Sequence, residues 1–120
     1  MTRVPLLILP ILDGGHELTI RKLKLQDDSF TIHYSITPPL PDADSAAPPF
    51  LPFLEAKDDL GNEYLDWGGA YGLSPDGIRT EGSLTGQPAP ASEAQVLLVR
   101  VTFVQDSRET AYDMTLRIRP

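Results

Sequence analysis

Apolar and polar residues alternate with a period of two in several segments of the chain, and this pattern favours strands. In residues 29–36, "SFTIHYSI", every second residue is apolar: Phe30, Ile32, Tyr34 and Ile36. Residues 111–119 repeat the pattern with Tyr112, Met114, Leu116 and Ile118. Side chains two positions apart lie on the same face of a strand, so each segment predicts a strand with one buried face. No window of ten or more residues shows the spacing of three and four that is typical of a helix.

A third segment, "QVLLVRVTFVQ", is apolar on one face and partly apolar on the other, through Val96 and Leu98. Its regular face carries Leu97, Val99, Val101 and Phe103. A strand of this composition is expected in the middle of a sheet, with another strand on each side. The polar connection "QDSRET" joins it to the last strand, so residues 95–104 and 110–119 are predicted to pair antiparallel.

Two weaker strand signals lie near the N-terminus. "MTRVPLLILPIL" is similar to a short signal sequence, but its prolines and the lack of a small-residue cleavage site favour an edge strand. The run is also shorter than the ~20 apolar residues that cross a bilayer. In "ELTIRKLKLQ" the apolar phase changes after Ile20, which predicts a β-bulge near Arg21 and Lys22.

The length of 120 residues suits one hydrophobic core, so residues 1–120 are predicted to form a single domain. Turn signals such as "SPDG" separate about seven to nine short strands. This pattern predicts an all-β fold with little helix: a single antiparallel β-sandwich, immunoglobulin-like in plan. Without cysteine the chain has no disulfide, and Trp67 is not assigned as the core tryptophan of an antibody-type domain.

The proline-rich segment "TPPLPDADSAAPPFLPFLE" interrupts this succession of strands. We expect residues 37–54 to form a crossover between the two sheets, stiffened by proline. Long connections inside a compact domain are often functional, so Phe50 and Phe53 are candidate partner-binding residues. The alternative is that both aromatic side chains pack back on the sandwich.

The most unusual composition lies in residues 56–72, "AKDDLGNEYLDWGGAYG". Its oxygen-bearing side chains are candidate calcium ligands: Asp58, Asp59, Asn62 and Asp66. Carboxylate and amide oxygens suit a hard cation, although their spacing is not that of an EF-hand loop. The other interpretation is a tight turn in which Asp side chains accept backbone N–H groups and Gly61 supplies a positive φ.

Two aromatic residues of the same segment, Trp67 and Tyr71, are flanked by glycines. Exposed aromatics can form a platform on which sugars stack, as in carbohydrate-binding sandwiches. More commonly, a glycine-rich strand uses aromatic side chains to fill the space above its glycines. Trp67 and Tyr71 are therefore candidate binding residues, for a protein partner or for a sugar.

The composition argues against two classes of function. With a net charge of −7, the chain lacks the clustered positive charge that binds nucleic acid. The two histidines, His16 and His33, lack the motifs that organise a hydrolase site, such as G-x-S-x-G or H-E-x-x-H. A small hydrolase would need one of them beside a carboxylate and a serine.

The turn "DDLGNEY", the glycine-rich aromatic segment after it and "PASEAQVLLVRVTF" together resemble bacterial immunoglobulin-like domains of unknown function. In such domains a D-D-x-G-N-x-Y turn precedes a late strand that follows a Pro/Ala-rich connection. The resemblance covers roughly residues 55–104. It implies an extracytoplasmic or accessory module with no assigned activity, which agrees with a binding or structural role.

We therefore expect a non-enzymatic interaction or structural module with an unidentified protein partner. We expect a monomer that needs no cofactor, does not insert into membranes and does not bind nucleic acid. The first alternative is a calcium-supported carbohydrate-binding module that uses the acidic turn for the ion and the two aromatics for the sugar. A small hydrolase is the second. The location is left open between the cytoplasm and the exterior of a bacterial cell.

Overall fold

A computed structural model describes residues 6–41 and 50–118, and within these residues the chain forms eight β-strands and no helix. The strands are β1 (Leu7–Ile11), β2 (His16–Leu25), β3 (Phe30–Thr37), β4 (Leu51–Asp58), β5 (Glu63–Leu73), β6 (Thr80–Gln87), β7 (Val96–Gln105) and β8 (Arg108–Arg117). The expected all-β fold is confirmed for this part of the chain. It contains no helix that is long and apolar enough to cross a membrane.

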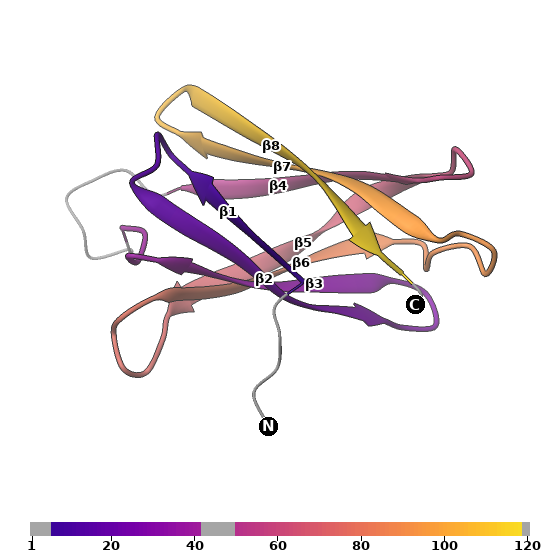
Figure 1. The fold of residues 1–120 in the computed structure, drawn as a ribbon, viewed down its shortest axis with the longest axis horizontal. Coiled ribbons are helices and arrows are strands. Elements are labelled where there is room, and N and C mark those ends of the chain that lie inside the picture. The colour runs from indigo at the N-terminus through magenta and orange to yellow at the C-terminus, as the bar shows by residue number, and fades with distance from the viewer. Residues whose placement is uncertain (1–5, 42–49, 119–120) are drawn as a thin grey trace.

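The eight strands pair antiparallel in the order β1-β2-β3-β6-β5-β4-β7-β8. Figure 1 shows this sheet folded over on itself, so that β2, β3 and β6 lie opposite β4, β7 and β8. Strand β5 belongs to both layers, because its first residues pair with β4 and its later residues pair with β6. The two edge strands of the sheet are β1 and β8. Leu12, directly after β1, donates its N–H to the hydroxyl of Tyr112 in β8 at 2.6 Å. The result is a nearly closed, barrel-like sheet.

The strand order confirms three details of the sequence analysis. Strand β7 lies between β4 and β8 and pairs with β8 along its whole length. Strand β1 is an edge strand that pairs with β2. The register between β2 and β3 shifts between Ile20 and Lys22, where the bulge is predicted.

The proline-rich crossover is shorter than predicted, because β4 begins at Leu51 rather than after residue 54. Residues 42–49 of the crossover lie outside the described residues. Pro52 fits inside β4 because the pairing of β4 with β5 is limited to Ala56 and Lys57, farther along the strand. At Pro52 a missing N–H therefore removes no bond of that ladder.

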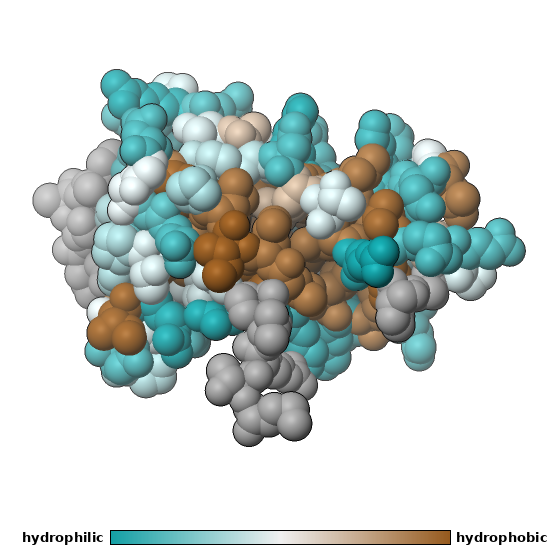
Figure 2. Space-filling view, in the orientation of Figure 1, coloured by the Kyte–Doolittle hydropathy of each residue, from teal (hydrophilic) through white to brown (hydrophobic). Residues whose placement is uncertain are grey.

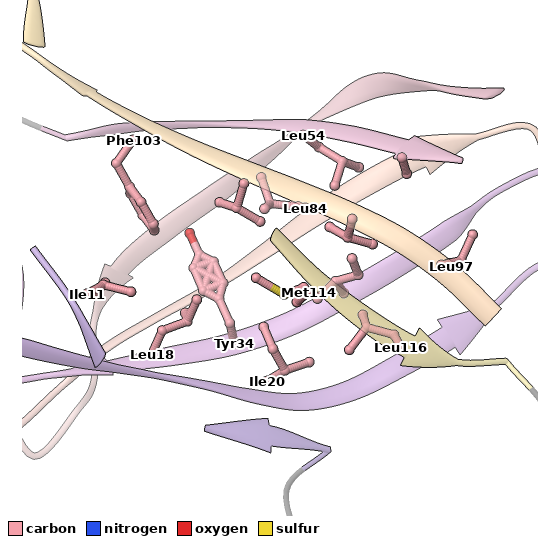
Figure 3. Close-up of a cluster of buried hydrophobic side chains, with 14 of the residues drawn as sticks. Ile11, Leu18, Ile20, Tyr34, Leu54, Leu84, Leu97, Phe103, Met114 and Leu116 are labelled. Atoms are coloured by element: carbon pink, nitrogen blue, oxygen red, sulfur yellow. The ribbon is translucent and has the colours of Figure 1, made fainter. Parts of the chain in front are cut away.

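The core lies between the two layers and follows the period-two pattern. The predicted inward residues of β3 and β7 are all buried: Phe30, Ile32, Tyr34, Ile36, Leu97, Val99, Val101 and Phe103. Figure 3 shows side chains from both layers, such as Leu18 and Tyr34 from one and Leu97 and Phe103 from the other, converging on this core. Each fully buried large apolar side chain stabilises the fold by roughly 1.5–3 kcal/mol. In β8, Tyr112 is only half-buried.

Two glycines of β6 make room for core aromatics of β3. In the register of these strands, Tyr34 lies opposite Gly82 and Phe30 lies opposite Gly86. A Cβ atom added at Gly82 would lie 2.5 Å from Cζ of Tyr34, and one added at Gly86 would lie 2.3 Å from Cζ of Phe30. Carbon atoms in favourable contact are about 3.5–4.0 Å apart, so neither position accommodates a side chain without moving a buried ring.

Alanine at Gly82 or Gly86 is expected to lower the free energy of unfolding by about 1–3 kcal/mol, because the added methyl group displaces a buried ring. Gly72→Ala is the matched control, since nothing lies within 4 Å of a Cβ added there. Urea unfolding followed by circular dichroism compares the three variants. Equal losses for Gly72→Ala and Gly86→Ala would contradict this explanation.

Candidate functional site

Asp58, the last residue of β4, organises the turn that leads into β5. The residue is only 2% exposed. Oδ1 accepts the backbone N–H groups of Leu60 and Asn62, each at 2.9 Å. Oδ2 accepts the side-chain amide of Asn62 at 3.0 Å and the hydroxyl of Tyr64 at 2.6 Å. Gly61 has a φ of 90°, as the turn interpretation requires.

The hydrogen bonds also set the protonation of this carboxylate. Burial alone would raise the pKa of Asp58, but the bonds from Tyr64, Asn62 and Leu60 outweigh it and lower the pKa to about 2. For Tyr64, burial first and then the bond to Asp58 raise the pKa of the hydroxyl. The Tyr64 oxygen in turn accepts the Ala91 N–H at 3.1 Å. The acidic turn is thus joined to the connection between β6 and β7.

The other predicted metal ligands serve the same structural purpose. Asp59 accepts the N–H of Gln95 at 3.0 Å, which also holds the connection before β7. Asp66 lies where β5 leaves β4, and its two oxygens accept the N–H groups of Leu54 at 2.9 Å and Gly68 at 2.7 Å. Within the described residues, no three His, Cys, Asp or Glu side chains gather as a group that could hold a metal ion. The geometry therefore favours a turn over a calcium site.

The aromatic residues predicted to act together are separated by a bulge in β5. The register with β6 shifts between Asp66 and Gly69, and Gly68 has a φ of 102°. Trp67 lies within this irregular segment and is 64% exposed. Tyr71 lies after it, is half-buried against the core, and donates its hydroxyl to the Phe50 carbonyl at 2.5 Å. The two rings do not form one exposed platform.

The two candidate phenylalanines also have different environments. Phe50 packs partly buried against the core, as the alternative interpretation of the crossover expects. Phe53 is 48% exposed on β4 and lies opposite Thr102 of β7. Of the four predicted partner-binding residues, the structure therefore leaves Phe53 and Trp67 available to a partner, while Phe50 and Tyr71 are tied into the fold.

Large hydrophobic residues are exposed on β4 and β5 near Phe53 and Trp67, and a further one, Leu98 of β7, lies opposite Lys57 of β4. We call this set the β4–β5 apolar surface: Leu51, Phe53, Leu65, Trp67 and Leu98. The bond from Leu54 to Asp66 keeps β4 and β5 together at this level, so Phe53 and Trp67 project from neighbouring backbone positions. The sequence analysis missed Leu65 because it follows inward-facing Tyr64. The exposure of Leu98 could have been predicted, because Val96 and Leu98 make the outer face of β7 partly apolar.

A groove of about 1070 Å³ extends across the layer of β4, β7 and β8. Its lining includes Leu7 and Leu9 of β1 and Met114 of β8, together with Leu65 and Leu98 of the β4–β5 apolar surface. Figure 2 shows hydrophobic residues gathered across the middle of one face of the protein, between β1 and β8 in the view of Figure 1. The volume is slightly above the range for small-molecule pockets, about 300–1000 Å³.

The two histidines do not form a hydrolase site with their neighbours. Nδ1 of His16 lies 2.7 Å from the Pro38 carbonyl oxygen, at an exposed position. His33 lies near Ser35 and Glu81, but the Ser35 hydroxyl accepts the Nε–H of Arg21 at 3.0 Å. Among these described residues, no hydrogen bond joins His33 to the serine or to the glutamate. A nucleophile paired with its base is therefore not formed.

Comparison with known proteins bears on the fold. No protein-family model and no curated protein matches the chain. A solved structure, described as the crystal structure of the conserved domain protein from Bacillus anthracis, is similar with a TM-score of 0.56 and 20% sequence identity. The match covers 88% of this chain and 44% of that protein, so this chain spans less than half of its length. At this identity the likeness shows a shared fold.

The depressed pKa of Asp58 predicts a specific loss of stability in acid. Its unfolded pKa is about 3.9, so the stabilising effect of the charged form is complete above about pH 4 and is lost as the pH falls toward 2. Urea unfolding should show wild type more stable than Asp58→Asn at neutral pH, with the difference shrinking between about pH 4 and 2. Asp27→Asn, at an exposed position between β2 and β3, is the control. A difference independent of pH would contradict the role of the charge.

Calcium is expected to leave the melting temperature unchanged, because the oxygens of Asp58 and Asp66 already accept hydrogen bonds from the protein. A ligand that binds only the folded state raises the apparent stability by mass action. Thermal unfolding in EDTA and in millimolar calcium tests this expectation. An upward shift in calcium that disappears in Asp59→Ala would instead establish a metal site at the turn.

Proposed function

We propose that this chain is a non-enzymatic interaction module that binds a protein partner through the β4–β5 apolar surface. The observation that carries the proposal is the exposure of Phe53, Leu65 and Trp67, at 48%, 69% and 64%. Contiguous exposed apolar residues on a soluble domain commonly mark a surface that a partner covers. Aromatic anchors such as tryptophan are also enriched at the centres of protein interfaces.

The strand order supports an immunoglobulin-like plan for this module. A constant-type immunoglobulin domain has strands ABED in one sheet and CFG in the other. If β2 to β8 are taken as A to G, the order β2-β3-β6-β5 corresponds to ABED and the order β4-β7-β8 corresponds to CFG. Strand β1 is then an addition beside A. Domains of this plan often present binding surfaces on an otherwise rigid framework.

A protein partner fits this surface better than a sugar does. Sugar-binding platforms depend on exposed aromatic rings that act together, and here Tyr71 is half-buried and bonded to Phe50. Leu65, two residues before Trp67 on β5, is also exposed, and aliphatic side chains of this kind suit the apolar side chains of a protein. Glu55 and Lys57 follow Phe53 on the outer face of β4 and supply charged groups next to it, as in the polar rim of an interface.

Alanine at Phe53 or at Trp67 is expected to weaken partner binding at least about tenfold, because anchor residues contribute about 2 kcal/mol or more. The partner is captured from a lysate of the source organism with immobilised protein, purified, and titrated by calorimetry. Both side chains are exposed, so each variant should keep its stability within about 0.5 kcal/mol. Ile78→Ala, at an exposed position before β6, is the control and should bind like wild type.

Trp67 is the only tryptophan of the chain and provides a second readout at the surface. Acrylamide should quench its fluorescence readily in the free protein and much less in the complex, because the partner excludes water from the ring. Unchanged affinity in both Phe53→Ala and Trp67→Ala, with unchanged quenching in the complex, would reject this surface. Self-association that Phe53→Ala abolishes would make the partner a second copy of the chain and contradict the expected monomer.

A further inference from the structure

A polar pocket of about 380 Å³ lies over β2, β3 and β6, in the layer opposite the one that carries Phe53. Its polar lining residues are Arg21, His33, Ser35, Arg79 and Glu81. All five project from the outer side of the layer, since the inward residues of β3 and β6 alternate with them. This pocket is separate from the β4–β5 apolar surface and plays no part in the function proposed above.

Arg21 is directed into the pocket by the bulge in β2. The register shift between Ile20 and Lys22 adds a residue to the outer face, and that residue is Arg21. Its Nε–H donates to the Ser35 hydroxyl at 3.0 Å. Ser35 is only 3% exposed, so the contact holds the guanidinium against the strand. Within the described residues this is the hydrogen bond that Arg21 makes, and its terminal amino groups are left to face the pocket.

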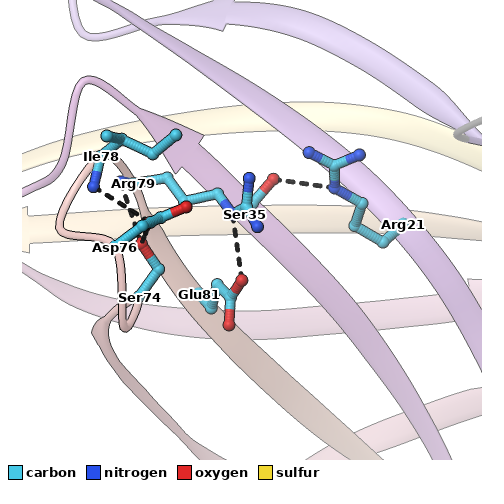
Figure 4. A network of polar contacts seen from close by, with 7 residues as sticks. All are labelled: Arg21, Ser35, Ser74, Asp76, Ile78, Arg79 and Glu81. Atoms are coloured by element: carbon cyan, nitrogen blue, oxygen red, sulfur yellow. Dashed lines mark hydrogen bonds and ion pairs between the residues drawn. The ribbon is translucent and has the colours of Figure 1, made fainter.

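Arg79 approaches from the other side and is held by the turn before β6. The Ser74 N–H donates to the Arg79 carbonyl at 2.8 Å, and the Arg79 N–H donates to the Ser74 hydroxyl at 3.3 Å. The same hydroxyl donates to Asp76 at 2.5 Å. The side chain is aligned by Glu81, whose carboxylate accepts the Nε–H of Arg79 at 3.0 Å. Figure 4 shows Arg21 and Arg79 on two sides of Ser35.

The arrangement is that of an oxyanion site. Both arginines use Nε for an internal contact, and their terminal N–H groups form the donor edges that bind carboxylate or phosphate. The serine hydroxyl accepts from Arg21, so its own proton can be donated to a ligand. A pocket of this volume is at the lower end of the range for small molecules, about 300–1000 Å³.

The net charge of the pocket favours a carboxylate over a phosphate. Two arginines and one glutamate give the pocket a net charge of +1 with His33 neutral, while the whole chain carries −7. A singly charged group is neutralised by the pocket, whereas a doubly charged phosphate leaves an uncompensated negative charge in a chain that already carries −7. From the geometry and this balance, we infer that the pocket binds the carboxylate of a small solute.

NMR titration of the full chain with sodium glucuronate tests the inference, at constant ionic strength in chloride. Saturating shifts are expected for the backbone signals of Arg21, Ser35 and Arg79. Glucose, which lacks the carboxylate, should cause none, and inorganic phosphate should bind more weakly than glucuronate. Arg21→Ala and Arg79→Ala should each weaken binding about tenfold. Arg117→Ala, at an exposed position on β8, should leave it unchanged.

Glu81→Gln provides an opposite prediction. Glutamine keeps an oxygen that accepts the Arg79 hydrogen bond but removes the charge, so the pocket changes from +1 to +2. Glucuronate should then bind about two- to fivefold more tightly, the effect of one exposed ion pair. A residue with a purely structural role would not produce this gain.

Several results would overturn the inference. These are shifts that do not saturate, equal weakening by Arg117→Ala and Arg21→Ala, binding of glucose, or no gain in Glu81→Gln. Tighter binding of phosphate than of glucuronate would overturn the choice of a carboxylate. If an alanine variant fails to fold, Arg21→Lys and Arg79→Lys replace it. Lysine keeps the charge without the planar donor edge, so binding should still weaken.

Discussion

The passage of β5 from one layer to the other is the constraint on which the rest of the structure depends. A strand that leaves its neighbour deprives backbone groups of their partners, and each buried unpaired group costs about 1–3 kcal/mol. Here side chains of β5 provide the hydrogen-bond partners that the backbone near β4 would otherwise lack. Asp66 accepts the Leu54 N–H, and Tyr71 donates to the Phe50 carbonyl. One strand thereby joins both layers into a continuous sheet.

The acidic turn secures the beginning of that same strand. Asp58 gathers four hydrogen bonds on one buried carboxylate, two of them from the backbone of the turn. Tyr64 and Asp59 extend the network to the connection between β6 and β7, through Ala91 and Gln95. Carboxylates that suit a cation by composition therefore serve to hold two chain reversals together. Their oxygens are occupied by the protein itself.

The crossing also explains why the two layers present surfaces of opposite chemistry. Because β5 pairs with β6 from Leu65 onward, the outer side of β4 near Phe53 is left beside exposed Leu65 and Trp67. On the other layer, the bulge in β2 and the turn before β6 place two arginines around one buried serine. An acidic chain thus carries a local positive pocket at a distance from its apolar surface.

Most of the strands and the core were predictable from local pattern. The alternation around Phe30 and Phe103 identifies the buried faces, because side chains two apart always share a side of a strand. The phase change after Ile20 identifies the bulge for the same reason, and Gly61 identifies the turn through its positive φ. These features depend on neighbours a few residues away, so sequence contains the needed information.

The roles of the site residues depended on partners that are distant along the chain. Asp66 bonds to Leu54, 12 residues away, and Tyr71 bonds to Phe50, 21 residues away. No local pattern distinguishes such a carboxylate from a cation ligand, or such a tyrosine from a sugar platform. The pocket likewise requires β2 to lie beside β3 and β3 beside β6. Strand order decides these contacts, because side chains interact across the sheet with residues that the linear chain keeps apart.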